Sequence, residues 1–279
     1  MDQGSNADGD ITSGGWSSEQ KQIGYVYRIG YNFDEKYMLE IAGRYDGHYY
    51  FAPGKRFGFF PSYSLGWNIA KEGFIANNIK WIDLLKLRCS YGESGNLAGE
   101  AFQYLTGYGI YSSSAYFNGT KTAGIYETKQ GNPEITWERA TKFDVGFEGS
   151  LWQGKLRFET DYFYEKRYDM LTTPDVTVPL EYGVELTQVN GGIMSNHGFE
   201  ISLGTSFSLF NEIKFSFDGN FTFAENKLLE VYETEVTYDN PNRRRTGRAN
   251  GTQFGLQALG YFTPDDFYRM EPLNQESLQ

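Results

Sequence analysis

The sequence NPEITWE at residues 132–138 opens the stretch that decides the fold, which ends at Tyr168. Two strand patterns follow it, joined by a short turn at residues 152–154. In the second strand, KLRFETDYFYE at residues 155–165, apolar or aromatic positions alternate with charged ones, and only Phe163 breaks the order. The first strand alternates likewise, with Phe143, Val145, Phe147 and Leu151 opposite Lys142, Asp144 and Glu148. This period of two predicts strands with one apolar face and one charged face.

The alternation alone leaves open which face meets water. In a soluble sandwich the apolar face is inside, whereas in a transmembrane barrel it faces lipid and the polar face lines the lumen. Three features favour the barrel. The strand patterns last about ten residues, the connections are short at one end and long at the other, and aromatic residues gather near strand ends, where an interfacial girdle would lie. We therefore predict an all-β fold, an antiparallel transmembrane β-barrel.

Eight strands are predicted, at residues 23–33, 37–46, 57–69, 85–91, 142–151, 155–165, 199–209 and 213–223. Long loops are expected at residues 47–56, 92–131, 170–196 and beyond 226, and one helical turn is expected within 70–83. No strand is assigned within the loop 92–131. The chain then divides into a polar loop at 1–22, barrel strands with long extracellular loops at 23–226, and a loop region at a truncated C-terminal end, 227–279.

Composition limits the class of protein. The 279 residues carry a formal net charge of -11, and 18% of them are aromatic. A mean hydropathy of -0.55 and the lack of an apolar run of about 18 residues exclude a helical membrane protein. The acidic balance argues against nucleic-acid binding. The single cysteine, Cys89, excludes an internal disulfide framework, and we expect it to pack on the apolar face of its strand.

Signals for catalysis, metal binding or a cofactor are weak. The two histidines, His48 and His197, lie far apart in the sequence and form no metal pattern with the lone cysteine. Glu159 and Asp161 share one strand face, where a glycosidase pair is conceivable, but they belong to a regular row of lumen charges. We therefore predict no enzyme activity, no catalytic residue, no metal and no cofactor, and we assign no ligand-binding residue.

The N-terminus is polar and rich in Gly, Ser and Asp as far as Gly15, without the charged and apolar regions of a signal peptide. A bacterial outer-membrane protein must be exported. Either the chain is a piece of something larger or the barrel prediction is wrong.

Several stretches resemble the SusC/RagA type of TonB-dependent outer-membrane transporters, and their order and spacing make the resemblance specific. They are RYDG at 44–47, RFGFFPS at 56–62 with Gly66-Trp67, LKLR at 85–88 through SYG at 90–92 to Gly95-Asn96, GNPEITWE at 131–138, YFY at 162–164 with YDML at 168–171, NGG at 190–192 leading into NHGFE at 196–200, and RTGR at 245–248 with Phe254-Gly255 and GYF at 260–262.

The resemblance implies a barrel of about 22 strands preceded by a signal, a TonB box and a plug domain, and this chain looks like an internal segment of that barrel. It implies energised import of a large nutrient, usually a glycan or an oligopeptide, across the Gram-negative outer membrane. It also implies two protein partners: a SusD-type surface lipoprotein, and TonB, which binds parts outside this chain. Aromatic residues of the long loops would contact substrate or lipoprotein, or else belong to the girdle.

Two other classes of protein remain open. One is a complete eight-stranded outer-membrane barrel with a structural or adhesive role, and the other is a soluble all-β carbohydrate-binding module. The small barrel would reconstitute from this chain alone, and the module would be a folded monomer without detergent. A barrel segment expressed alone would aggregate, because its two open edges leave backbone groups unpaired in lipid.

Overall fold

The computed structural model of the chain describes residues 15, 17–174, 183–184, 186–210, 212–258 and 260–261. The strands and short helical segments within them are β1 (Gln22–Phe33), β2 (Tyr37–His48), β3 (Phe57–Asn68), η1 (Ile69–Lys71), α1 (Gly73–Ala76), β4 (Ile82–Asn96), β5 (Gly107–Phe117), β6 (Thr120–Lys129), β7 (Glu138–Leu151), β8 (Leu156–Thr172), β9 (Val189–Leu209), β10 (Ile213–Glu230) and α2 (Glu235–Asp239). Among these residues, no helix combines the length and the apolar character needed to cross a membrane.

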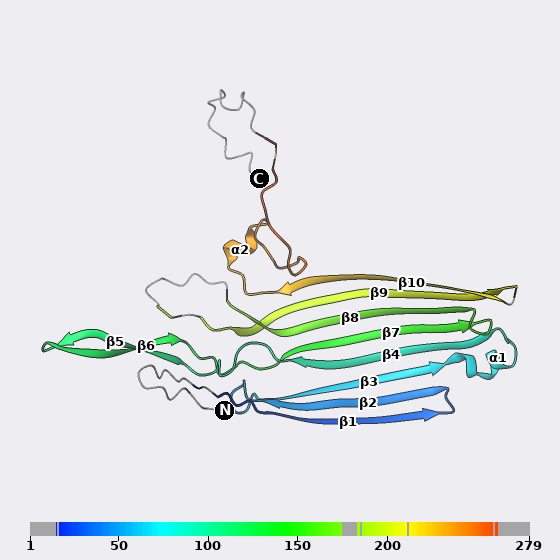
Figure 1. Cartoon of the computed structure of the whole chain (residues 1–279), viewed down its shortest axis with the longest axis horizontal. Coiled ribbons are helices and arrows are strands. Elements are labelled where there is room, and N and C mark those ends of the chain that lie inside the picture. Colours follow the sequence, from blue (N-terminus) through cyan, green and yellow to red (C-terminus); the bar gives the residue numbers. More distant parts are fainter. Residues whose placement is uncertain are drawn as a thin grey trace, which may run out of the picture.

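Eight of the strands form one antiparallel sheet in the order β1-β2-β3-β4-β7-β8-β9-β10 (Figure 1). Each strand of this series therefore lies beside the next. The tight turns after β1, β7 and β9 and the helical connection after β3 lie at one end of the sheet, the short-turn end, and the connections after β2, β4 and β8 lie at the other, the long-loop end. β5 and β6 pair with each other and form a hairpin that extends beyond the long-loop end (Figure 1). All eight predicted strands are confirmed, and β1 and β10 form the two edges of the sheet.

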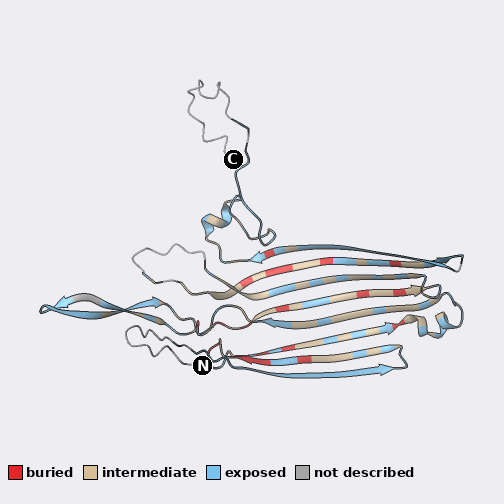
Figure 2. Cartoon of the chain, viewed as in Figure 1, coloured by how far each residue is buried: buried red, intermediate tan, exposed pale blue. Residues whose placement is uncertain are grey.

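The two faces of the sheet differ in chemistry. On the apolar face of the β1–β2 pair, Tyr25 lies opposite Tyr45 and Ile29 lies opposite Ile41. Tyr25 is 62% exposed and Ile29 is 65% exposed, and β1 and β10 are exposed along most of their length (Figure 2). No second layer covers the apolar face within the described part of the chain. An apolar face left open over a whole sheet is suited to lipid and not to water.

The height of the apolar face matches a membrane. β3 carries an aromatic ring near each end of this face, Phe57 and Trp67. At about 3.3 Å per residue, the strand rises about 33 Å between them. A tilt of about 40° reduces this to about 25 Å, the height of the lipid-facing band in outer-membrane barrels. The predicted antiparallel transmembrane barrel wall therefore agrees with the geometry of the sheet.

Left-handed backbone conformations shape the short turns. Asp34 and Glu35 have φ values of 53° and 51°, and Trp152 and Gln153 have 54° and 60°. Consecutive residues with positive φ form turns whose twist matches that of two antiparallel strands. The connection between β3 and β4, at the same end, contains η1 and α1, which confirms the helical turn expected there.

The strands reach further toward the long-loop end than the alternation indicates. β4 continues to Asn96, β9 begins at Val189 and β10 ends at Glu230, so parts of the expected loops are strand. Polar and glycine residues hide the alternation in these ends, whereas pairing with a neighbouring strand keeps them extended. The expected loop 1–22 lies largely outside the described residues, and so do residues 262–279.

A hairpin occupies part of the expected loop 92–131, where the sequence analysis assigned no strand. Its turn is Asn118-Gly119, with φ values of 50° and 74°. Asn-Gly is the residue pair preferred in two-residue hairpin turns, because both positions need positive φ. This pair was the signal from which the hairpin was predictable.

Candidate functional site

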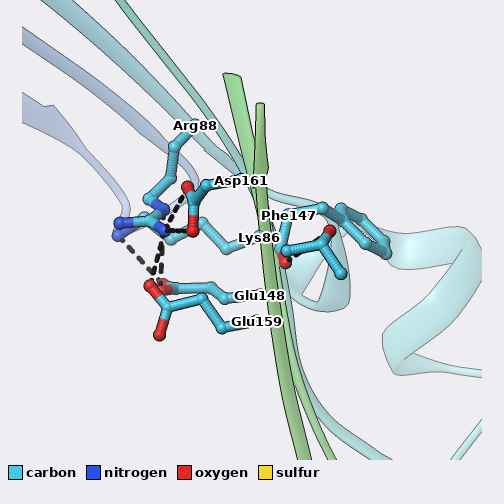
Figure 3. A network of polar contacts seen from close by, with 7 residues as sticks. Lys86, Arg88, Phe147, Glu148, Glu159 and Asp161 are labelled. Atoms are coloured by element: carbon cyan, nitrogen blue, oxygen red, sulfur yellow. Dashed lines mark hydrogen bonds and ion pairs between the residues drawn. The ribbon is translucent and has the colours of Figure 1, made fainter. Parts of the chain in front are cut away.

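The polar face of the sheet carries the candidate site, because it is the face that lines the lumen in a closed barrel. Ion pairs follow this face from β1 to β10: Arg28–Glu40, Arg44–Asp46, Lys86–Glu148, Arg88–Asp161, Lys142–Glu165 and Arg157–Asp218. Figure 3 shows the central network on one side of the strands and Phe147, an apolar-face residue, on the other. The side chains thus separate by chemistry as the alternation predicts.

Arg88 of β4 is the centre of this network (Figure 3). Its Nη2 lies 2.8 Å from Oδ1 of Asp161 and 2.6 Å from Oε1 of Glu159, both on β8. Its Nε lies 3.8 Å from Oε2 of Glu148 on β7, and the same carboxylate lies 3.3 Å from Nζ of Lys86. One guanidinium therefore joins three adjacent strands on the polar face.

A glycine makes this contact across three strands possible. Gly146 of β7 lies between Arg88 and Asp161 in the strand register, opposite both. A Cβ added at Gly146 would lie 2.1 Å from Oδ1 of Asp161 and 2.9 Å from Nη2 of Arg88. The lack of a side chain on the middle strand lets the outer two residues meet above it.

The same arrangement recurs on β8, β9 and β10. Gly204 of β9 lies opposite Arg157 of β8 and opposite Asp218 of β10. Nη2 of Arg157 and Oδ1 of Asp218 are 3.2 Å apart, and a Cβ at Gly204 would lie 2.6 Å from Asp218. The lumen face thus repeats a basic residue, a glycine and an acidic residue across neighbouring strands.

Glu159 and Asp161, the conceivable glycosidase pair, are both bound by Arg88. They therefore belong to the row of lumen charges, as the sequence analysis favoured. The network holds three carboxylates and two cations, and Asp144 and Glu200 add further negative charge near Asp161. This part of the wall is polar with an excess of carboxylates.

The other residues considered for chemistry are separated. His48 ends β2 and His197 lies in β9, with four strands between them in the sheet. Within the described residues, no group of three or more His, Cys, Asp and Glu side chains could hold a metal ion. Cys89 lies between Leu65 and Val145 on the apolar face, which confirms its expected place.

At the long-loop end, the ladder between β3 and β4 stops early and leaves a fork. β3 pairs with β2 from Phe57 onward but with β4 only from Ser62 onward. Pro61 lies where the ladder with β4 ends, and a proline has no N–H to donate. β4 itself continues to Asn96, paired with β7.

Residues 131–137, which we call the strap, pack at this fork. Ile135 and Trp137 of the strap are buried together with Phe51 and Phe60. Nε1 of Trp137 donates a 2.9 Å hydrogen bond to the carbonyl oxygen of Arg56. Within the described chain these four side chains form the buried hydrophobic cluster. The NPEITWE motif at residues 132–138 therefore supplies half of the cluster.

The polar residues of the motif tie the strap to distant strands. The Asn190 side chain accepts a 3.0 Å hydrogen bond from the Thr136 amide and donates to the carbonyl oxygens of Thr136 and Asp169, at 3.0 and 2.7 Å. Glu138, just after the strap, accepts from the Leu171 amide and from the Asn96 side chain, both at 2.8 Å. Through Asn190 and the adjoining Glu138, the strap is thus connected to β4, β8 and β9 at their long-loop ends.

Aromatic side chains gather beside the strap and beyond it. His48 lies against Tyr49, Tyr50 and Trp137, with ring centroids 4.8, 4.5 and 6.4 Å away. The β5–β6 hairpin beyond them presents exposed rings, of which Tyr111 and Tyr126 stack at 4.3 Å. The long-loop end therefore carries one of the groups of aromatic residues that the sequence predicts near strand ends.

Comparisons with known proteins agree with this architecture. A family profile described as "TonB dependent receptor-like, beta-barrel" matches residues 2–275. TonB-dependent receptor P26 of Formosa agariphila is 35% identical over 179 residues, which are 64% of this chain and 18% of that protein. TonB-dependent receptor SusC of Bacteroides thetaiotaomicron is 24% identical over 265 residues, which are 94% of this chain and 26% of SusC.

A solved structure has the same fold. The RagAB peptide importer in its "closed-closed" state superposes with a TM-score of 0.70 and 22% identity, covering 83% of this chain and 25% of that chain. This chain spans 18% to 26% of the length of the curated relatives named above. The chain therefore belongs to the TonB-dependent receptor β-barrel family, whose barrels lie in the Gram-negative outer membrane, and it matches one segment of such a barrel.

Proposed function

We propose that this chain forms part of the wall of a transporter that imports a large nutrient, a glycan or an oligopeptide, across the outer membrane. TonB supplies the energy, and a SusD-type lipoprotein covers the barrel outside the cell. Receptors of this family are transporters and not enzymes. The likeness to SusC along 94% of the chain and to a structure named as a peptide importer supports the proposal.

The observation that carries the proposal is the division of the sheet into a lipid-facing side and a charged side. A hydrophilic cargo needs a wall that offers hydrogen bonds and charges in place of water. The paired charges around Arg88 supply both. A lumen of this kind suits sugars and peptides and disfavours apolar cargo.

The two other classes of protein fit the geometry less well. A complete eight-stranded barrel needs β1 to pair with β10, whereas these strands are the two edges of the sheet. A soluble module needs its apolar face covered, whereas rings such as Tyr25 stay 62% exposed.

Uptake in the source bacterium tests the proposal. Strains lacking the full-length gene, or lacking TonB, are given fluorescent glycans and fluorescent oligopeptides of matched size. We expect one of the two classes to enter wild-type cells and to be lost to the same extent in both mutants. Uptake of both classes that is unchanged without the gene would refute the assignment.

The native size of the protein separates the segment from the small barrel. An antibody against residues 97–131 is used on outer membranes from the source cells. A band several times the calculated 31.9 kDa supports a full transporter, whereas a membrane band near 31.9 kDa supports the small barrel. The same small band in the soluble fraction supports the binding module.

A further inference from the structure

The connection between β3 and β4 folds over the apolar face at the short-turn end of the sheet. Oε1 of Glu72 accepts hydrogen bonds from Oη of Tyr37, at 2.5 Å, and from Nε1 of Trp67, at 3.1 Å. Both rings belong to the apolar face, where Tyr37 is 47% exposed and Trp67 36%. A carboxylate bound by two rings of that face lies on the lipid side of the wall and not on the lumen side.

Further contacts hold this connection against the neighbouring turn. The Asn68 amide donates a 2.7 Å hydrogen bond to the carbonyl oxygen of Lys36. Lys71 forms an ion pair with Glu35 of the same β1–β2 turn. The connection is therefore attached to β2, to β3 and to the turn before β2. These contacts hold it on the apolar side of the sheet.

Held in this way, the connection presents apolar rings at the rim of the lipid-facing band. Phe74, in α1, is 60% exposed and has no polar atom that would suit it to water. Trp81 stacks on Trp152 with ring centroids 5.4 Å apart, and both are about half exposed. Tryptophan at such a level is typical of the boundary between lipid and water.

We propose that residues 69–81 form a membrane-surface anchor that rests among the phospholipid headgroups of the leaflet facing the periplasm. Short turns face the periplasm in outer-membrane barrels. Phe74 lies at the boundary between headgroups and acyl chains, and Glu72 lies in the hydrated headgroup layer on the periplasmic side of this boundary. The anchor continues the lipid-facing band of β3 without a break, since Leu65 and Trp67 of that band lead directly into η1.

Lys80 agrees with such an occupant. It is exposed at one end of the anchor, and a basic residue beside apolar ones is typical of segments that lie on a phospholipid surface. The inference rests on the outer-membrane location of the family and is independent of the cargo.

Spin labels on the full-length receptor test the depth of the anchor. The receptor is reconstituted in liposomes of phosphatidylethanolamine and phosphatidylglycerol, with Cys89→Ser as background. One variant carries the label at Phe74→Cys, one at Glu212→Cys in the exposed β9–β10 turn as the aqueous control, and one at Leu65→Cys as the lipid control. Collision with oxygen, which concentrates in lipid, is compared with collision with a nickel chelate, which stays in water.

We expect the ratio of oxygen to nickel collisions at position 74 to approach that at 65 and to exceed that at 212 several-fold. Adding Glu72→Ala should lower the ratio at 74 toward that at 212 and leave the ratio at 65 unchanged, because the hydrogen bonds of the carboxylate hold the anchor against the apolar face. A ratio at 74 equal to that at 212 would refute the proposal. A label at 74 reached by neither reagent would also refute it, since a protein surface would then cover the site.

Discussion

Gly146 is the residue on which the lumen network depends most directly. In Gly146→Ala, the new methyl group would lie 2.1 Å from the Asp161 carboxylate and 2.9 Å from the Arg88 guanidinium, so one of them must move. Overpacking of this kind typically costs about 1–3 kcal/mol. We expect the full-length receptor to lose its heat-modifiable mobility at a lower temperature on gels.

Gly66 provides the matched control for this substitution. It lies on the same face, in β3 between two strands of this chain, and an added Cβ would lie no nearer than 3.3 Å to Cε of Met38 and 3.4 Å to Cε of Lys86, which are flexible side-chain ends. Gly66→Ala should change the free energy of unfolding by less than about 0.5 kcal/mol. Equal unfolding temperatures for the two variants would contradict the role given to Gly146.

Glu72 makes the anchor sensitive to acid. Hydrogen bonds from Tyr37 and then Trp67 outweigh partial burial and hold the pKa of Glu72 below its usual value. Because the pKa is lowered in the folded state, the ionised Glu72 carboxylate makes its full contribution to stability above the ordinary glutamate pKa of about 4.3. That contribution is lost as the pH falls through the folded pKa.

We therefore expect Glu72→Gln to lower the melting temperature of the receptor at pH 7. The difference from wild type should shrink as the pH falls below the ordinary glutamate pKa of about 4.3, and it should disappear once the pH is below the lowered folded-state pKa, where wild-type Glu72 is protonated as well. Melting curves at a series of pH values measure this. A difference that stays constant down to the lowest pH would show that the carboxylate charge plays no part.

At the scale of the elements, the strap predicts a local effect of Asn190. Asn190→Asp keeps the acceptor for the Thr136 amide but removes the donor to the carbonyl oxygens of Thr136 and Asp169. Leaving a half-buried group without its partner costs about 1–3 kcal/mol. We expect hydrogen exchange of residues 131–137 in the full-length receptor to become faster.

Asn220→Asp, on the exposed polar face of β10, introduces the same charge away from the strap. Exchange at residues 131–137 should be unchanged in this control. If both variants accelerate exchange equally, the added charge and not the lost donor is responsible.

At the scale of the whole molecule, the two open edges predict that this chain does not form a stable membrane protein by itself. β1 and β10 each leave one row of backbone N–H and C=O groups without a strand partner, and lipid offers no replacement. We expect the isolated chain to aggregate in detergent micelles and to show no heat-modifiable band. A folded monomer of 31.9 kDa with a cooperative melting transition would contradict this prediction.

Local sequence is enough to predict the strands and the chemistry of their two faces. The alternation in KLRFETDYFYE at 155–165 is a local property, because successive side chains of any strand point to opposite faces. It therefore predicted two faces of different chemistry and the row of charges with Glu159 and Asp161, and the same alternation at residues 85–91 predicted the place of Cys89. It failed at the strand ends near the long loops, where polar residues and glycines leave no period to detect.

Which residues contact one another depends on the folded sheet and cannot be predicted from local sequence. Arg88 and Asp161 are 73 positions apart, and their contact depends on the order of β4, β7 and β8 and on a glycine between them. The same holds for Asn190 and the strap. It also holds for Glu72, which follows β3 and binds Tyr37 of the neighbouring β2 on the same face. Each contact follows from the order and register of the strands. Pairing between distant segments sets that order and register, so no local sequence pattern contains them.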